Sequence, residues 1–588
     1  MKLLAELQRR NVLRAGVLYA GAVWALAQGI SQLSPAIGLP DWATRWFLVA
    51  AAIGFPFAMF FSWFYEWTPQ GLKRESEIAT DASIVRSTGR KLDRAISAVL
   101  AIAVVLLLTN TFVWHKGAGL HEEPVSTITA KSIAVLPFVN MSGDPKNDYF
   151  SDGITEEILN ALAQVPNLKV AARTSAFTFK GREGDLRKIA DTLDVATVLE
   201  GSVQKFGDAV RITAQLVDTR SGFQLWSEKY DRKLDNIFAV EDEISRAITD
   251  RLRLQWSAAA DQPQTARHAI DPHAHDFYLR GLPLIAARGP GLREAAADFQ
   301  QAVAIDPDYA QAWAALAETQ ILLPHYFLES QETAFPVGEA AAKRALALDP
   351  NTAAAYVALA MMYRIQWKWR DADTAFQRAM KIAPGDAEAV DQYGQFLLAV
   401  GRLDEALTQI GRAQRLDPLS GVIAATRVNV LTGLHHFDDA EAQSRDMLSE
   451  RPDFALGQFV AADAAIYRRD YALAKSRFQA GAGLIGEAPD VYMALVDGVA
   501  DPGQRAAAIR VVLAASGDTH QRLTEPARIK WLMLLGDHGD ALDALQRIGH
   551  DVMFGQDNVW QPAFDPVRGD PRFKAALDRM GLPYTPGN

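Results

Sequence analysis

The stretch AAAYVALAMMYRIQWKWRDADTAFQRAMKIAP, residues 353–384, decides the fold of most of the chain. Its apolar residues recur three and four positions apart in two blocks, which predicts two amphipathic helices joined by a short turn. Pro350 precedes the stretch, Pro384 ends it, and Pro418 and Pro452 follow, all at a constant spacing of 34 residues. A fixed period of this length indicates a stack of equivalent helix pairs.

Aromatic, small and proline residues stand at fixed places within this unit. They match the pattern of the tetratricopeptide family, which the unit therefore resembles, at Tyr356, Ala360, Tyr363, Ala372, Phe376, Ala379 and Pro384. The resemblance implies an all-α superhelical solenoid, which we expect over residues 272–548 with a capping segment at 549–588. Because aromatics fill the space between successive pairs, we expect Phe376 in the core.

One unit departs from the period. The interval from Pro307 to Pro350 is 43 residues, which predicts an insertion around LPHYFLESQETAFP at residues 323–336.

A smaller α/β domain is expected before the repeats, at residues 131–256. Residues 132–140 are apolar on both faces, as in a central strand, and the helical stretch 151–165 follows with Ser151 or Asp152 as its expected cap. A second strand at 168–173, a helix at 185–195 and an antiparallel meander of three strands at 197–207, 210–218 and 223–231 complete the pattern.

Four short motifs in this domain resemble the amino-terminal domain of the periplasmic protein TolB and its FlgO-like relatives. They are IAVLPF, YFSDGITEEI, VLEGSV and the ending LVD..SG..LWSE..D. The resemblance implies a small module for envelope protein assemblies with no reaction of its own. Asp152, Glu156 and Glu157 could form a carboxylate cluster for acid–base work, but a helix cap with an acidic first turn explains them without a site.

The front of the chain predicts a membrane domain at residues 1–116 and a linker at 117–130. Three apolar runs at about 12–33, 44–65 and 95–114 are long enough to cross a bilayer. Gly21, Ala25 and Gly29 share one helical face, which suggests homo-oligomers through close helix contact, although incidental small residues are an equal explanation. An alternative is that residues 1–27 form a cleaved signal peptide.

Cations cluster before the first run and between the second and third runs, including Lys73, Arg74, Arg90 and Lys91. By the positive-inside rule these segments stay in the cytoplasm. The expected location is therefore a bacterial inner membrane, with several passes and the C-terminal body in the periplasm.

A partner-binding groove is expected on the first helices of the repeats, which line the concave side of such a solenoid. The positions projected to face it are Glu318, Met361, Arg364, Glu388, Asp391, Gln395, Asn429, Phe459, Asp463 and Tyr467. Acids outnumber bases in this set, and it lacks the basic pattern that this family uses to clamp a C-terminal carboxylate. Each position taken alone also fits solvated surface.

Catalytic and metal chemistry are not expected. The chain has no cysteine, and its net charge of −10 disfavours nucleic acid as a partner. Gly481, Gly483 and Gly486 have dinucleotide-binding spacing but end a repeat helix, and His273 and His275 point to different faces of a helix. No catalytic residue, metal ligand or cofactor is predicted.

The sequence therefore predicts an inner-membrane-anchored periplasmic scaffold or adaptor that binds envelope proteins or peptides through its repeats and TolB-like domain. The alternative is a sensory or regulatory membrane protein that acts through a separate cytoplasmic signalling partner. Related chains place a winged-helix DNA-binding or nucleotide-cyclase domain on the cytoplasmic side of similar spans. Here about 11 residues before the first span and about 28 between the second and third are too few for either fold.

Overall fold

The computed structural model divides into two compact units, Met1–Val125 and Ser126–Asn588. It describes residues 131–181, 186–207, 209–233, 237–251, 270–326, 328–515, 523–549 and 558–582, together with Tyr19, Val23, Phe55, and the backbone of 65–68 and 71–74.

In the first unit, the described backbone forms one antiparallel hairpin. Strand β1 (Tyr65–Thr68) pairs with β2 (Gly71–Arg74), and Trp67 lies opposite Leu72. Lys73 and Arg74, which the sequence placed in a basic connecting segment, are part of β2.

The prediction of three membrane-spanning helices is corrected here. In the part of the chain that the structure describes, no helix combines the length and the apolar content needed to cross a membrane. The predicted runs at 12–33, 44–65 and 95–114 lie almost entirely outside that part. The longest described helix, α12 (Gln331–Leu348), carries the charged residues Glu332, Glu339, Lys343 and Arg344. The multi-pass inner-membrane location was predicted from these spans, and the described residues do not support it.

The second unit begins with a mixed β-sheet. Strand β3 (Ser132–Val135) lies parallel to β5 (Lys169–Val170) and to β6 (Thr197–Phe206), which also pairs with the short β4 (Val139–Asn140). Strands β7 (Ala209–Asp218) and β8 (Gln224–Lys233) extend the sheet antiparallel to β6. The order is therefore β5-β3-β6-β7-β8, as a strand–helix unit followed by a meander requires.

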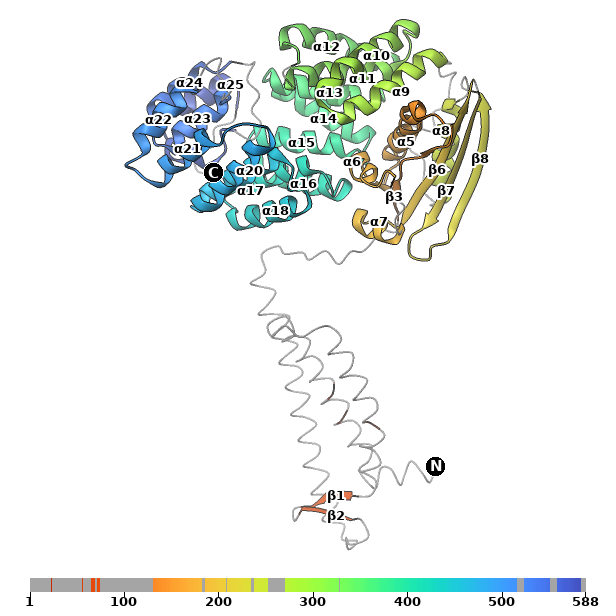
Figure 1. Ribbon diagram of the computed structural model, residues 1–588, viewed down its shortest axis with the longest axis horizontal. Helices are drawn as coiled ribbons and strands as arrows, with labels where there is room; N and C mark the ends of the chain where they lie inside the picture. Colours follow the sequence, from red (N-terminus) through yellow and green to blue (C-terminus); the bar gives the residue numbers. More distant parts are fainter. Residues whose placement is uncertain are drawn as a thin grey trace. The chain divides into compact units, whose positions relative to one another are not determined.

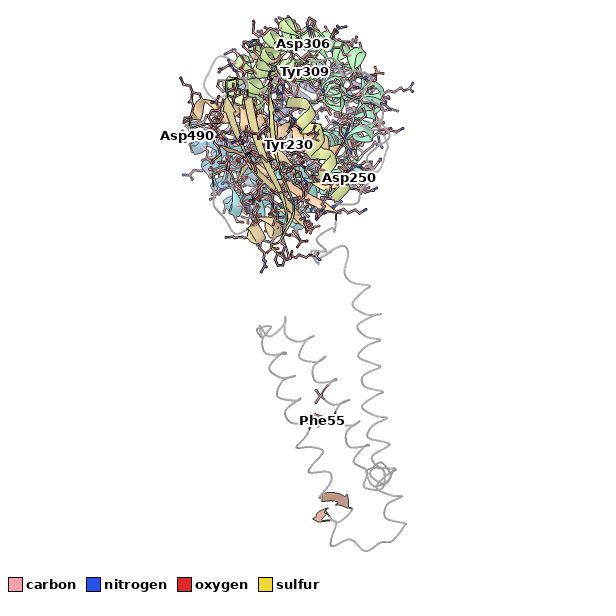
Figure 2. The ribbon with its side chains drawn as sticks, turned by 90° about the vertical axis from the view of Figure 1, so that its right-hand side faces the viewer. Phe55, Tyr230, Asp250, Asp306, Tyr309 and Asp490 are labelled. Carbon is pink, nitrogen blue, oxygen red and sulfur yellow. The ribbon has the colours of Figure 1, made fainter. Side chains whose placement is uncertain are left out.

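Helices cover both faces of this sheet around β3. Helix α5 (Asp148–Ala163) and α8 (Ile237–Arg251) pack on one face, where Ile154, Ile158 and Ile244 join the main core. Helix α7 (Leu186–Leu193) packs on the other face, against Ala134 and Val198. Figure 2 labels Tyr230 on β8, which is buried under α8, and Asp250 near the end of that helix.

Two local details differ from the sequence prediction. Helix α5 begins at Asp148, after a 3-10 turn (Pro145–Asn147) that Asp144 caps, so Ser151 and Asp152 lie inside the helix and are buried. The expected strand at 168–173 is limited to β5, because the backbone turns into α6 (Arg173–Phe177).

Paired helices follow from Pro272 onward (Figure 1). Their bounds are α9 (Pro272–Ala287), α10 (Leu292–Ile305), α11 (Ala310–His325), α12 (Gln331–Leu348), α13 (Ala353–Ile365), α14 (Trp369–Ile382), α15 (Ala387–Ala399), α16 (Leu403–Leu416), α17 (Gly421–Gly433), α18 (Phe437–Glu450), α19 (Ala455–Tyr467), α20 (Tyr471–Leu484), α21 (Asp490–Ala500), α22 (Arg505–Ala514), α23 (Glu525–Leu534), α24 (His538–Arg547) and α25 (Pro571–Met580).

The packing of these pairs follows the pattern in the sequence. Phe376 is fully buried, with Tyr393 and Phe396 around its ring at centroid distances of 5.9 and 5.7 Å. The extra residues of the long unit lengthen α11 to 16 residues and α12 to 18, against 13 and 14 in the next pair. Asp306 and Tyr309, labelled together in Figure 2, close the turn between α10 and α11.

The C-terminal segment folds back onto earlier repeats. The indole of Trp560 donates to the carbonyl of Ala399 at 2.9 Å, and that of Trp369 donates to the carbonyl of Met580 at 2.6 Å. Gly401 has a φ of +80°, and a Cβ there would lie 2.7 Å from the Trp560 ring. The segment therefore seals the middle of the array as well as its end.

Candidate functional site

The ten predicted groove residues lie on the first helices of successive pairs. Glu318 is on α11; Met361 and Arg364 are on α13; Glu388, Asp391 and Gln395 are on α15; Asn429 is on α17; Phe459, Asp463 and Tyr467 are on α19. The structure divides them into an N-terminal group that shares an electrostatic environment and a C-terminal group engaged by other parts of the chain.

Arg288 connects two of the acids in the N-terminal group. It lies directly after α9, and its Nη1 and Nη2 atoms are 3.5 Å from Glu318 Oε1 and 3.7 Å from Glu388 Oε1. Its φ of +61° falls in the left-handed region, which is strained for a residue with a side chain. The backbone therefore holds a guanidinium between carboxylates of α11 and α15.

Asp391 is the most enclosed acid of this group, with 3% of its surface exposed. Its Oδ2 accepts a hydrogen bond from Gln395 Nε2 at 2.8 Å, while its Oδ1 has no hydrogen-bond partner among the described residues. Burial, together with the nearby Glu388, raises the pKa of Asp391 to about 8.

The pKa values of three neighbouring carboxyls are also raised. Burial raises the pKa of Glu318 to about 7 and that of Asp386, which caps α15, to about 6. Burial also raises the pKa of Asp417, directly after α16, to about 6. We call Glu318, Asp386, Glu388, Asp391 and Asp417 the acidic cluster.

Few cations balance the acidic cluster. Arg288 and Arg364 are the guanidinium groups of the repeats that act on it, and Arg364 Nη1 reaches Gln395 Oε1 at 3.4 Å. Burial lowers the pKa of the neighbouring His325, so this ring stays neutral near pH 7. Five carboxyl groups therefore face two guanidinium groups, and some of the carboxyls must stay protonated or find another cation.

The α/β domain contributes to the same region. Arg173 at the start of α6 donates to Glu156 of α5 at 2.8 Å, and burial raises the pKa of Glu156, which also senses Arg288. This pair is close to neutral overall, so it leaves the charge imbalance of the acidic cluster unchanged.

Three contacts fix the α/β domain to the repeat turns beside the cluster. Ser175 donates to Asp417 Oδ1, the amide of Gly385 donates to the carbonyl of Ala163 at 3.0 Å, and the amide of Ala172 donates to the carbonyl of Leu416 at 2.8 Å. Figure 1 shows α6 beside α15 and α16. The α/β domain is thus bonded to two successive turns of the repeats.

Asp152, Glu156 and Glu157 lie inside α5 and do not cap it; Glu157 contacts the repeats, and the other two pair within the α/β domain. Lys180 Nζ contacts Asp152 at 2.6 Å, and the Tyr278 hydroxyl donates to Glu157 at 2.7 Å. All three carboxylates are therefore held by partners, which differs from the cap that the sequence suggested.

The C-terminal group of groove residues is engaged by the chain itself. Lys530 of α23 contacts Asp463 at 2.7 Å, and Gln561 donates to the carbonyl of Asn429 at 3.3 Å. Phe459 lies 5.3 Å from Tyr492 by ring centroids, and Tyr467 stacks on Phe437. The C-terminal group therefore forms packing contacts more than an open surface, and Met361 of α13 is likewise buried.

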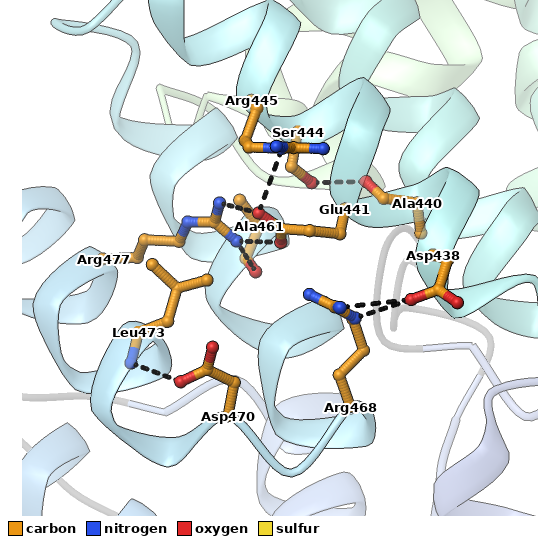
Figure 3. Close-up of polar contacts among 10 residues, drawn as sticks. All are labelled: Asp438, Ala440, Glu441, Ser444, Arg445, Ala461, Arg468, Asp470, Leu473 and Arg477. Atoms are coloured by element: carbon orange, nitrogen blue, oxygen red, sulfur yellow. Dashed lines mark hydrogen bonds and ion pairs between the residues drawn. The ribbon is translucent and has the colours of Figure 1, made fainter. Parts of the chain in front are cut away.

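A buried ion pair stabilises the same half of the array (Figure 3). Arg477 Nη1 and Nη2 contact Glu441 Oε2 and Oε1 at 2.7 and 2.8 Å, and both side chains are under 10% exposed. Arg477 also donates to the carbonyl of Ala461 at 3.0 Å, so one guanidinium ties α18, α19 and α20 together.

Other motifs from the sequence have structural places. His275 is buried with its Nδ1 atom 3.1 Å from the Tyr309 hydroxyl, and Gly481, Gly483 and Gly486 lie at the end of α20. Among the described residues, no three His, Asp or Glu side chains are arranged to hold a metal ion.

Sequence projection missed Arg288, Asp386 and Asp417, because each stands at a helix end rather than on a groove-facing helix position. A signal for Arg288 was present in the following Gly289-Pro290-Gly291, which marks a sharp turn.

Comparison with known proteins gives partial matches. No family model matches the chain. A protein of Rhizobium meliloti (strain 1021) with the name "Putative adenylate cyclase 3" is 43% identical over 201 residues, which are 34% of this chain and 34% of that protein. The chain therefore spans about a third of the length of this curated relative.

Two solved structures share helical repeats with the chain. YrrB, described as a TPR protein with an unusual peptide-binding site, is 18% identical with a TM-score of 0.25, over 32% of this chain and 91% of that one. PilW, a type IV pilus biogenesis factor, is 19% identical with a TM-score of 0.29, over 34% and 91%. The 34-residue spacing and the helix pairs of the chain itself define a tetratricopeptide-like array.

Proposed function

We propose that this protein is a scaffold that binds protein or peptide partners on the inner side of its repeat array. The observation that carries the proposal is the acidic cluster, which the array and the α/β domain surround but do not neutralise. Glu388 keeps 46% of its side chain exposed, so a partner can reach this region. The resemblance of the α/β domain to TolB-like modules supports a role in protein assembly.

Site-specific photo-crosslinking in cells tests this proposal. A photo-reactive amino acid at Glu388 is expected to crosslink a discrete partner protein that mass spectrometry can identify. The same amino acid at Glu332, an exposed position of α12, serves as the control. Equal crosslinking from both positions, or none from position 388, would count against the scaffold.

A second candidate is regulation through a separate signalling partner, with no catalytic activity in this chain. The 43% identity to a protein named as an adenylate cyclase favours a link to signalling, although it covers a third of each chain. Purified full chain incubated with ATP and Mg²⁺ is expected to form no cyclic AMP. Formation above a heat-inactivated sample would make the chain an enzyme.

A further inference from the structure

Asp391 Oδ1 is an acceptor placed without a donor in a region rich in acceptors. Only 3% of the surface of Asp391 is exposed, and no described group donates to this atom. Leaving a buried polar atom unpaired is unfavourable, so this atom favours a donor that the described residues do not supply. The Oε1 atom of Gln392, on the same helix, also lacks a donor among the described residues. Helix α15 therefore carries two buried acceptor atoms without a donor among the described residues.

The nearby carboxyls favour a cation as the donor to Asp391 Oδ1. Glu388 stands three positions before Asp391 on α15, so the two carboxyls share one helix face. The Gln392 amide donates to Glu388 Oε1 at 3.1 Å, which places all three polar groups together. Arg288 contacts Glu318 and Glu388, whereas among the described residues no ion pair is formed with Asp391.

The chain itself shows which cation fits. Arg288 already lies between Glu318 and Glu388 at ion-pair distances of 3.5 and 3.7 Å. A guanidinium is therefore compatible with this part of the cluster. A metal ion is not, because no three ligating side chains come together in the described parts of the molecule. Phosphate-bearing ligands would be repelled by the same carboxyls.

We propose that the acidic cluster binds a basic segment of a protein partner, whose Lys or Arg side chain donates to Asp391 Oδ1 and pairs with Glu388. This inference rests on the proposed scaffold function and specifies the chemistry of the partner. The exposed side of Glu388 is the entry, and the buried Asp391 is the end point of the inserted side chain.

Binding of such a cation has a proton signature. Asp391, with its pKa at about 8, carries a proton for most of the time at pH 7. A bound ammonium or guanidinium favours the carboxylate, so the complex releases that proton. The affinity then rises as the pH increases from 6 to 8, whereas attraction to exposed carboxylates alone is nearly constant over this range.

Selection of random dodecapeptides on the purified full chain tests the inference. Enriched peptides are expected to carry Lys or Arg at a recurrent position. Calorimetry should show that replacing this cation by Gln weakens Kd by about tenfold or more, which equals about 1.4 kcal/mol. The double variant Glu388→Gln/Asp391→Asn should weaken Kd by a similar factor, and combining the two changes should add little further.

A matched control variant loses carboxylates at positions outside the acidic cluster. Glu332→Gln/Glu450→Gln removes two exposed carboxylates, at the start of α12 and the end of α18, and should change Kd by less than about twofold. Unchanged thermal unfolding of each variant confirms that the fold is retained.

The outcomes separate the two proposals. Enriched peptides that are neutral or acidic, or basic peptides that respond equally to the control variant, overturn the basic-partner inference and leave the scaffold standing. Displacement of the peptide by spermidine at equal concentration would also overturn it, because a small polyamine would then be the ligand. A selection that enriches no peptide overturns both.

Discussion

Ser175 in helix α6 of the α/β domain donates a hydrogen bond to Asp417, which ends helix α16 of the repeats. The same hydroxyl accepts from the amide of Leu419 at 2.9 Å, so one buried serine satisfies two groups of the repeat turn. The two domains are thereby joined through a side chain that has no role in its own helix.

Replacing Ser175 by Ala should loosen this junction. Loss of the hydroxyl removes one hydrogen bond from Asp417 and takes away the acceptor of the Leu419 amide, at a cost of about 1–3 kcal/mol. We expect faster hydrogen–deuterium exchange in α6 and in residues 416–420, measured by mass spectrometry. Ser221→Ala, in an exposed turn where the serine bonds only locally with Asp218 and Phe223, should leave that exchange unchanged. Equal exchange in both variants would mean that the junction does not depend on Ser175.

The buried pair of Arg477 and Glu441 should dominate the stability of its helices. Arg477→Ala leaves Glu441 buried without its main counter-charge, which costs about 3–5 kcal/mol. Exchange of the α18 and α20 amides is expected to rise accordingly. Arg468→Ala is the comparison, because its partner Asp438 is 93% exposed and such a pair contributes less than about 1 kcal/mol. A small effect of Arg477→Ala would show that solvent reaches Glu441.

Phe376 is expected to be essential to the packing of its repeat. Phe376→Ala removes a fully buried ring and should lower the free energy of unfolding by about 3–5 kcal/mol. Urea denaturation followed by circular dichroism measures the change. Phe223→Ala, at a position that is 74% exposed, should lie within about 0.5 kcal/mol of the original chain. Equal decreases in the free energy of unfolding for the two variants would mean that the structure closes the cavity left by the Phe376 ring.

Asp391 should make stability depend on pH. Burial raises its pKa from the ordinary 3.8 to about 8. The groups that face it are Glu388 and Gln395 on its own helix, Arg364 on α13 and Asp417 after α16. The folded chain therefore holds a proton that the unfolded chain releases, so this contribution is full below about pH 4 and is lost as the pH rises through about 8.

The variant Asp391→Asn tests this sign. Its Tm should fall less than that of the original chain between about pH 5 and pH 8.5, because the amide cannot titrate. Glu332→Gln, an exposed change on α12, should keep the original slope. A slope that Asp391→Asn leaves unaltered would assign the pH dependence to other carboxyls of the cluster.

The repeats and the sheet could be predicted because local pattern determines them. The 34-residue spacing, the aromatic at 376 and the alternation in β6, β7 and β8 each reflect a packing requirement within a few dozen residues. The apolar runs at the front are long enough to cross a bilayer, but their length and hydrophobicity were the only basis for predicting spans. No helix in the described part of the chain meets the requirements for a span.

The site could be predicted only in part. Periodicity placed Glu318, Glu388 and Asp391 on inner helices, but Arg288 and Asp417 stand at helix ends, where no period applies. The contact between Ser175 and Asp417 joins positions 242 residues apart, and such a contact leaves no mark in a single sequence. The C-terminal contacts at Asn429 and Asp463 were missed for the same reason.

The anchoring of Gly385 and Leu416 to one small domain has a mechanical consequence. These residues flank turns one repeat apart, and both are bonded to the stretch between Ala163 and Ala172. An isolated array of helix pairs can change its curvature by small movements between neighbouring pairs. Here two consecutive repeats are both hydrogen-bonded to the α/β domain. The relative orientation of these two repeats is therefore fixed before binding, and a partner has to fit that orientation.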